Sequence, residues 1–469
     1  MAVVSITALA LALRLLGISR QSVWFDEAFS VGVAALPMPA LLDAAAHDLN
    51  PPLYYLLLHA WLPLATNDAW LRLPGVLCSS ATVGLTAWLG QRLFDWRTGL
   101  LAAVLLATSS FHIALSQEAR AYALFGLLAM ASVCALVQAR ARGTRRWWLT
   151  FAAVSVLALY SHNYGMFLLV AEATWLAGEM VWQRHLDRRA CLAFLLIGVL
   201  YLPWVPVLLG QAGTSTWIER ADVGAFAQTY FSFIASTPPG HGGDPLARAA
   251  RWGILALLPL ALLPARNRSL TLLLGSIVIG GTLLPVLLSM SIVPLFVVRY
   301  TAYVLPAFWL IVARAASTLP TRPLRAAVAG IIALEVVVNL PPLYTDPFYS
   351  RSDLRAAVEE VRSSAGADQL VIHTTEFTQY PFAYYDRGSL DDALIAAGDR
   401  ASLRGVVADR PSFWYVASYD VQDPDAAASA EQQAGVDLCE WRITTRYDLL
   451  GVKLYQVGRP AIPDRPSCP

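Results

Sequence analysis

The sequence predicts a mainly α-helical fold, a polytopic membrane bundle with about eleven transmembrane helices, juxtamembrane helices and a small C-terminal extracytoplasmic α/β domain. Of the 469 residues, 57% are hydrophobic and 14% are charged, whereas soluble globular chains carry about 25% charged residues. The mean hydropathy of +0.52 agrees. The net charge of +1 creates no field that would attract nucleic acid, so no nucleic-acid partner is expected.

Eleven apolar segments are candidate membrane spans, because a span needs about 20 residues including its flanks. The segments are residues 3–17, 70–89, 100–115, 121–137, 147–160, 164–181, 190–209, 252–264, 270–291, 301–312 and 324–340. The first could be a signal peptide, but it lacks a basic start and is interrupted by Arg14, so we interpret it as a span. Residues 51–64 are apolar but shorter, which favours an interfacial helix, with Asn50 as its expected cap.

Arginines indicate the orientation of the chain, because positive residues gather in cytoplasmic loops. Basic loops contain Arg92 and Arg97, residues 140–146, residues 184–189, Arg266 and Arg268, and residues 314–325. These loops share one side of the membrane if residues 51–64 do not cross it. The opposite, extracytoplasmic face then holds most of the unusual polar residues, so we expect the functional site on that face.

The domain boundary is expected near residue 344, with a transmembrane catalytic module at 1–344 and an extracytoplasmic domain at 345–469. Residues 352–363 show helical spacing after Ser352 or Asp353 as a possible cap. Residues 369–373 and 413–418 are predicted strands, which together indicate an α/β domain. The domain contains no glycine-rich phosphate loop, which favours a lid or stability module over independent catalysis.

Cysteine usage gives no metal or redox motif, because the five cysteines form no C-x-x-C pair. Cys439 and Cys468 lie in the tail and could form a disulfide only if the tail faces an oxidising compartment.

Two adjacent acids, Asp26 and Glu27, stand in the aromatic sequence WFDEAFS of the first outer loop. A carboxylate near the hydrocarbon costs free energy, up to about 2.5–3.5 kcal/mol at the centre of a membrane helix. Acids kept at such a position indicate function. The alternative is structural, with Asp26 capping a helix that follows it.

The next part of the same outer loop reads HDLNPPLYY, residues 47–55. His47, Asn50, Tyr54 and Tyr55 are candidate substrate contacts. Tyr54 and Tyr55 equally suit the aromatic belt that membrane proteins place at the interface.

Later outer loops supply basic and polar candidates. Gln117, Glu118 and Arg120 lie in SQEAR; Glu118 and Arg120 could simply pair with each other. His162 in SHNYG is a candidate hydrogen-bond donor or a core histidine. Arg299 could reach lipid headgroups or bind a phosphate, since its planar fork of donors suits phosphate oxygens.

Four motifs in order make the sequence resemble the bacterial relatives of protein O-mannosyltransferases (family 39-type) within the GT-C membrane glycosyltransferases. The motifs are WFDEAFS at 24–30, NPPLYYL at 50–56, SQEARAY at 116–122 and the Arg299–Tyr300 pair. They extend over roughly the first 340 residues, and each motif alone is weak. The family has histidine where this chain has Asn50, which puts any metal or proton role at that position in doubt.

The resemblance implies a GT-C-like fold and transfer of a sugar from a polyprenyl-phosphate carrier to an acceptor hydroxyl, with inversion, at the outer face of the bacterial inner membrane. It implies Asp26 as general base and Glu27 as a second catalytic residue that helps to position the acceptor and the donor phosphate. The donor-phosphate residues would be Arg120, Arg299, Gln117, Tyr122 and Tyr300. The acceptor or substrate residues would be His47, Asn50, Tyr54, Tyr55, Glu118, His162, Asn163 and Tyr164. The acceptor could be a glycan, a lipid or a protein. No cofactor is specified, and a divalent metal stays open.

The main alternative is a polytopic transporter or flippase for lipids or solutes. Such proteins place ionisable residues near the middle of the membrane and often contain inverted halves. Here the ionisable residues gather at one face and no internal repeat is evident, which favours the enzyme. A scaffold or receptor would leave the acids and arginines without a purpose.

Overall fold

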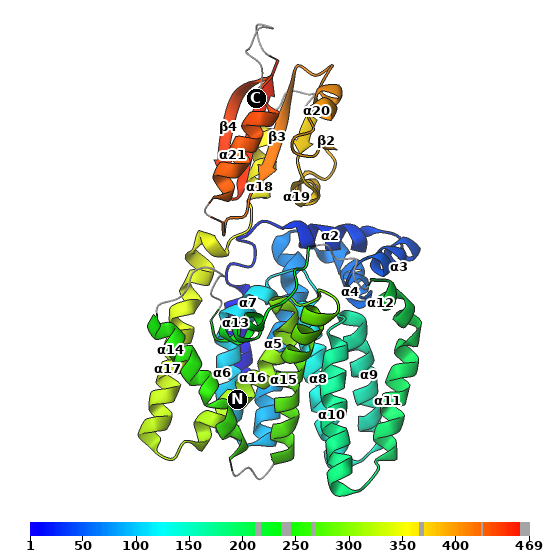
Figure 1. The fold of residues 1–469 in the computed structure, drawn as a ribbon, viewed down its shortest axis with the longest axis vertical. Helices are drawn as coiled ribbons and strands as arrows, with labels where there is room; N and C mark the ends of the chain where they lie inside the picture. Colours follow the sequence, from blue (N-terminus) through cyan, green and yellow to red (C-terminus); the bar gives the residue numbers. More distant parts are fainter. Residues whose placement is uncertain (212–216, 236–244, 264–267, 365–369, 424, 460–469) are drawn as a thin grey trace. The chain divides into compact units, whose positions relative to one another are not determined.

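The computed structural model describes residues 1–211, 217–235, 245–263, 268–364, 370–423 and 425–459 (Figure 1). The chain divides into two compact units. The first contains Met1–Leu16 and Ala34–Leu343, and the second contains Gly17–Val33 and Tyr344–Pro469. The sequence placed residues 17–33 with the membrane module, whereas in the structure they group with the C-terminal domain.

All secondary-structure elements in the described part of the first unit are helices. Its helices are α1 (Ala2–Leu15), α3 (Met38–His47), α4 (Leu53–Trp61), η1 (Leu62–Leu64), α5 (Asp68–Leu93), α6 (Trp96–Thr108), α7 (Ser110–Ser116), α8 (Tyr122–Arg142), α9 (Arg145–Ser161), α10 (Gly165–Gln183), α11 (Arg188–Tyr201), η2 (Leu202–Trp204), α12 (Val205–Gln211), α13 (Val223–Ile234), α14 (Pro245–Ala256), η3 (Leu258–Leu262), α15 (Arg268–Ser291), η4 (Val298–Val304), α16 (Leu305–Thr318) and most of α17 (Arg322–Thr345).

Six helical segments in the described part are long and apolar enough to cross a membrane, or seven if α6 and α7, which meet at 60°, form one broken span. The mainly helical membrane fold is thus confirmed, while the count of eleven crossings stays a prediction. Several expected spans are short or interrupted: α1 has 14 residues and α9 has 17. The expected span at 252–264 runs over the end of α14 and over η3, which are separate helices. Arg266 and position 264 lie outside the described residues.

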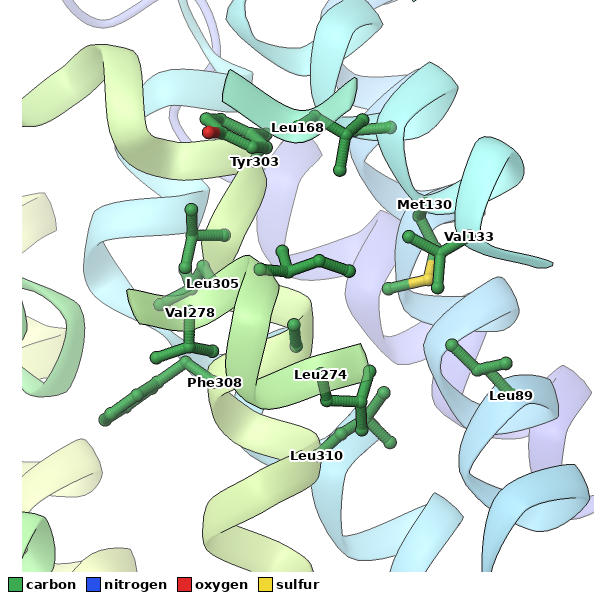
Figure 2. Packing of buried hydrophobic residues seen from close by; sticks show 14 of the residues in the cluster. Leu89, Met130, Val133, Leu168, Leu274, Val278, Tyr303, Leu305, Phe308 and Leu310 are labelled. Carbon is green, nitrogen blue, oxygen red and sulfur yellow. The ribbon is translucent and has the colours of Figure 1, made fainter. Parts of the chain in front are cut away.

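The core of the first unit is built around α16. Leu305, Phe308 and Leu310 of α16 lie among Leu274 and Val278 of α15, with α8 and α5 nearby (Figure 2). A helix that is apolar on all sides belongs inside a bundle, and 83% of the span that contains α16 is buried. By contrast, 19% of α17 and 22% of the span from α11 to α12 are buried, which suits helices that face lipid.

In the second unit, five described strands form one sheet in the order β2-β1-β3-β5-β4. The strands are β1 (Leu370–His373), β2 (Asp391–Leu394), β3 (Ser412–Ser418), β4 (Arg442–Leu449) and β5 (Val452–Gly458). β1 pairs in parallel with β2 and β3, whereas β5 pairs antiparallel with β3 and β4. The strands expected at 370–373 and 413–418 are confirmed; position 369 lies outside the described residues.

Helices cover both faces of this sheet. The helices are α18 (Leu354–Ser363), α19 (Glu376–Asp386), α20 (Arg400–Val406) and α21 (Ala426–Asp437). Leu354 and Phe382 share a core with Trp414, while Leu403 and Ala434 share another core with Tyr415. Neighbouring strand residues point to opposite faces, so Trp414 and Tyr415 divide these two cores. The C-terminal α/β domain is thereby confirmed, and Asp353 rather than Ser352 caps α18.

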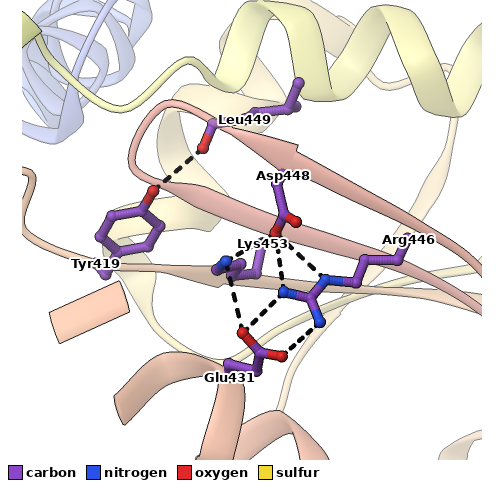
Figure 3. Close-up of polar contacts among 6 residues, drawn as sticks. All are labelled: Tyr419, Glu431, Arg446, Asp448, Leu449 and Lys453. Atoms are coloured by element: carbon purple, nitrogen blue, oxygen red, sulfur yellow. Dashed lines mark hydrogen bonds and ion pairs between the residues drawn. The ribbon is translucent and has the colours of Figure 1, made fainter. Parts of the chain in front are cut away.

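A polar network joins α21 to the β4–β5 hairpin (Figure 3). Arg446 and Lys453 both contact Asp448 and Glu431, with 2.7 Å between Lys453 Nζ and Asp448 Oδ1. Lys453 is buried, but the other three side chains are at least 37% exposed, and ion pairs with such exposure contribute little free energy each. The apolar cores hold the domain together. The proposed Cys439–Cys468 disulfide involves position 468, which lies outside the described residues.

Candidate functional site

The predicted site residues are divided between the two units. Asp26 and Glu27 belong to the second unit, and the other predicted residues belong to the first. The acids lie in α2 (Phe25–Ala35), which begins before Asp26. Asp26 is therefore the second residue of the helix and not its cap. Glu27 Oε2 instead accepts a hydrogen bond from the backbone N–H of Trp24 at 3.4 Å, the reach-back contact of a capping box.

Arg14 organises the region before the SQEAR motif. Its side chain is fully buried, and it donates to the carbonyl oxygens of Leu106 and Ala107 at 3.3 and 3.0 Å. These carbonyls end α6, where the last helical carbonyls have no partner within the helix. Arg14 also contacts Ser79 Oγ and His112 Nδ1, both at 2.7 Å. Sequence reasoning assigned Arg14 no role, although an arginine inside an apolar segment was the signal for one.

The loop that follows α7 is fixed by two further contacts. Gln117 Nε2 donates to the carbonyl oxygens of Arg14 and Leu16 at 2.9 and 2.8 Å. Both amide donors of Gln117 thus bind main-chain carbonyls at the C-terminal end of α1. On the other side, a Cβ at Gly75 of α5 would lie 2.7 Å from the carbonyl oxygen of Ser116. The SQEAR loop can approach α5 this closely because residue 75 is glycine.

Asp48 gathers the polar groups around the NPPLYY motif. Its Oδ2 accepts hydrogen bonds from the backbone and side-chain N–H groups of Asn50 at 3.2 and 2.9 Å, and from the hydroxyl of Tyr55. The expectation that Asn50 caps the following helix is wrong: α4 begins at Leu53 with Pro52 in the cap position. Asn50 turns back to Asp48, a local alternative that such side chains readily adopt.

Burial raises the pKa of Tyr55 well above its usual value of 10, and the negative charge of Asp48 raises it further. The positive charge of Arg120 opposes this shift, so Arg120 lies within electrostatic reach of Tyr55. The SQEAR loop and the NPPLYY segment therefore meet in the first unit. Tyr54 is also buried, with its ring centroid 6.4 Å from that of Tyr55.

His162 lies in the connection between α9 and α10, in contact with four aromatic rings. Its ring stacks on Phe125 at 5.2 Å and meets Tyr300, Tyr164 and Tyr122 at 4.9, 5.4 and 6.1 Å between centroids. This brings Tyr122 and Tyr300, expected at the donor phosphate, together with His162 and Tyr164, expected at the acceptor. The structure does not separate these residues into two groups.

The protonation of His162 follows from its contacts. Burial lowers the pKa of its imidazole to about 3, and the charges of Arg120 and Arg299 also lower it, so the ring is neutral near pH 7. Nδ1 accepts from the backbone N–H of Tyr164 at 3.1 Å, so the proton of the neutral ring is on Nε2. That buried Nε2–H has no hydrogen-bond partner among the described residues, nor has the buried hydroxyl of Tyr122.

Arg299 is held by aromatic rings. Its guanidinium carbon lies 5.6 Å from the ring centroid of Trp217 and 5.7 Å from that of Tyr300. Such cation–π contacts help to orient a guanidinium. Trp217 was not among the predicted site residues, and nothing in the sequence around it marked it as one.

A cavity of about 330 Å³ is lined in part by the aromatic cluster of His162, Tyr164 and Tyr300. Its polar lining comes from Asn50, His162, Asn163, Gln211 and the tyrosines Tyr164 and Tyr300, and the rest of its lining is mostly apolar side chains of α10, α12 and α15 and their loops. Asn163 Nδ2 donates to the carbonyl of Leu49 at 2.8 Å, which links two of its walls. Cavities of this size and lining are typical of small-molecule sites.

Of the predicted site residues, five line this cavity: Asn50, His162, Asn163, Tyr164 and Tyr300. The other predicted residues are outside its lining. His47 is exposed, and its Nδ1 contacts the carbonyl oxygen of Asp43 on its own helix at 2.8 Å. Glu118 contributes its carbonyl oxygen to the backbone N–H of Arg120 at 2.8 Å. No group of three or more His, Cys, Asp or Glu side chains that could hold a metal ion occurs within the described ranges.

Comparison with known proteins places this geometry in a fold family. Residues 49–209 match the family model described as dolichyl-phosphate-mannose-protein mannosyltransferase. The crystal structure of ArnT from Cupriavidus metallidurans bound to undecaprenyl phosphate matches with a TM-score of 0.62 and 12% identity, over 99% of each chain. The chain has a GT-C glycosyltransferase fold. The resemblance noted in the sequence is thereby confirmed.

Other GT-C structures match less of their own length. AglB from Archaeoglobus fulgidus, in complex with an inhibitory peptide and a dolichol-phosphate, has a TM-score of 0.53 and 12% identity over 97% of this chain and 73% of AglB. AftD from mycobacteria, an arabinofuranosyltransferase, has a TM-score of 0.53 and 14% identity over 97% of this chain and 40% of AftD. At these identities the likeness concerns the fold. A comparison with curated proteins finds no match.

Proposed function

We propose that this protein is an inverting glycosyltransferase that moves a sugar from a polyprenyl-phosphate donor to an acceptor hydroxyl on the extracytoplasmic face of the membrane. The observation that carries the proposal is His162, which lines the cavity, has a buried Nε2–H without a hydrogen-bond partner among the described residues, and lies within electrostatic reach of Arg120 and Arg299. The GT-C fold supports it, because ArnT has been solved with undecaprenyl phosphate and AglB with a dolichol-phosphate.

His162, Arg120 and Arg299 suit the phosphate of a lipid carrier. Two guanidinium groups and a neutral imidazole N–H offer donors to phosphate oxygens, and charge-assisted hydrogen bonds of this kind are strong. The apolar wall formed by Leu208, Leu288 and Leu295 suits the first isoprene units. We therefore assign His162, together with Arg120 and Arg299, to the donor phosphate. Asn50, Asn163 and Gln211 would contact sugar hydroxyls.

Transfer is a single displacement at the anomeric carbon of the donor. The acceptor oxygen attacks this carbon from the side opposite the phosphate, and the bond from the carbon to the phosphate oxygen breaks with its electron pair on the phosphate. Arg120 and Arg299 stabilise the charge that develops on the leaving polyprenyl phosphate. Asp26 takes the proton of the acceptor hydroxyl, a contribution of about 10²–10⁴-fold to the rate.

Purified protein in nanodiscs, supplied with polyprenyl-phosphate-linked sugars and a panel of protein, lipid and glycan acceptors, tests the proposal. The expected result is a new glycoside of inverted configuration and one polyprenyl phosphate released per sugar transferred. Movement of the intact lipid-linked sugar between leaflets, without release of polyprenyl phosphate, would contradict the enzyme assignment and favour a flippase.

A further inference from the structure

The segment that carries Asp26 is bound by the C-terminal α/β domain, with which it forms one compact unit. We propose that this domain positions the proposed base, by holding residues 19–25 so that the first turn of α2 has a fixed place. The proposal rests on the proposed function in that it takes Asp26 as the base. It assigns the C-terminal domain a role in the reaction beyond that of a lid or a stability module.

Main-chain groups of the segment are satisfied by side chains of the domain. The guanidinium of Arg355 donates to the carbonyl oxygens of Ser19 and Gln21 at 3.0 and 3.1 Å. The backbone N–H of Val23 donates to the hydroxyl of Tyr385 at 2.6 Å. In return, Gln21 Nε2 donates to the carbonyl oxygen of Tyr349 at 2.9 Å. Contacts to main-chain groups fix the path of the segment and not merely one of its side chains.

Ser22 is joined to the start of α18. Its hydroxyl donates to Asp353 Oδ1 at 2.7 Å, and the same oxygen accepts the backbone N–H of Ala356 at 3.2 Å as the helix cap. The backbone N–H of Arg355 lies 3.3 Å from Ser22 Oγ. Ser22 is 3% exposed, so its contacts are made away from water, where a lost hydrogen bond leaves a buried polar group unpaired.

Aromatic contacts hold the next two residues. The guanidinium of Arg351 lies 4.1 Å from the ring centroid of Trp24. The ring of Phe25 lies 4.6 Å from that of Phe377 and 5.5 Å from that of Tyr380, both on α19. Aromatic pairs with this spacing attract one another beyond the effect of their buried area.

These contacts end at the residue where α2 begins. Trp24 is the cap whose N–H binds Glu27, and Phe25 is the first residue of α2, directly before Asp26. Whatever fixes residues 22–25 therefore fixes the first turn of the helix and the direction of the Asp26 side chain. Tyr385, Asp353 and Arg355 are positioning residues for Asp26, since they act through the segment.

Tyr385→Phe removes the hydroxyl that accepts the Val23 N–H and keeps the ring. The matched control is Tyr419→Phe, which removes a tyrosine hydroxyl of the same domain that bonds the carbonyl of Leu449 (Figure 3). In the full-length protein, Tyr385→Phe should speed hydrogen exchange of the peptide covering residues 19–29 by roughly 3- to 10-fold, the factor of one net hydrogen bond. It should also lower kcat by a similar factor with the affinity for undecaprenyl phosphate unchanged.

Ser22→Ala removes the same kind of contact from the side of the segment and changes no residue of the α/β domain. It should give the same pattern, and Tyr419→Phe should give neither change. Unchanged exchange in both Tyr385→Phe and Ser22→Ala would overturn the contact as a positioning device. Faster exchange with unchanged kcat would overturn the role of the domain in placing Asp26. If the wild-type protein transfers no sugar, the proposed function fails, and the exchange comparison still decides whether the domain holds the segment.

Discussion

Arg120→Gln should weaken the binding of undecaprenyl phosphate by roughly 30-fold, or about 2 kcal/mol. One guanidinium about 4 Å from a phosphate contributes roughly 4 kcal/mol at an effective dielectric constant of 20, and its loss of hydration offsets part of this. Hydrogen bonds to charged groups contribute about 1.5–3 kcal/mol net. Loss of Arg120 also relieves His162 of one positive charge. Because burial is the larger cause of the low His162 pKa, the ring stays neutral near pH 7 and adds no compensating charge.

The measurement is a titration of the purified variant in nanodiscs with undecaprenyl phosphate at fixed ionic strength. Arg97→Gln is the control for the loss of one arginine, because Arg97 is exposed and its guanidinium lies 5.3 Å from the ring centroid of Trp96, outside the proposed donor site. The control should keep wild-type affinity. If Arg120→Gln binds undecaprenyl phosphate as tightly as the control at an equal melting temperature, the donor-phosphate assignment of Arg120 is refuted.

Two further variants test the same cluster. In the folded protein the pKa of His162 is about 3, whereas in the unfolded chain a histidine binds a proton below about pH 6.5, so acid favours unfolding. Between about pH 7 and pH 5, the melting temperature of His162→Gln should therefore fall less than that of the wild type. An equal fall in both melting temperatures would argue against a buried neutral His162. Gly75→Ala would place a Cβ 2.7 Å from the Ser116 carbonyl oxygen. It should lower the free energy of unfolding by about 1–3 kcal/mol and weaken donor binding. Gly126→Ala, where a Cβ meets nothing within 4 Å, is its control, and equal donor affinity in the two variants would show that the SQEAR loop does not need Gly75.

Hydrophobic length predicted much of the helical bundle. The expected span at 70–89 lies within α5, and the span at 121–137 lies within α8. The segment at 100–115 breaks into α6 and α7 at Ser109, which caps α7 through the backbone N–H of His112. The hydropathy pattern does not predict this break, because the break depends on a contact from another helix: Arg14 donates to the carbonyls that the break frees.

Motif order pointed to Arg120 and Arg299, and the polar SHNYG loop pointed to His162, but their grouping depended on contacts far apart in the sequence. Asp48 became the centre of its loop because it binds both Asn50 and Tyr55, whereas a local helix rule favoured Asn50 as a cap. The association of residues 17–33 with the C-terminal domain was also missed. It joins positions more than 300 residues apart, such as Ser22 and Asp353, and no local pattern encodes such a pairing.

The most direct test of the account measures donor binding and sugar transfer in the same preparation of Asp26→Asn. This variant should bind undecaprenyl phosphate with wild-type affinity, because the proposed donor site consists of Arg120, Arg299 and His162, while transfer should fall by at least about 10²-fold with loss of the proposed base. Wild-type transfer by Asp26→Asn would contradict the assignment of Asp26 as the base.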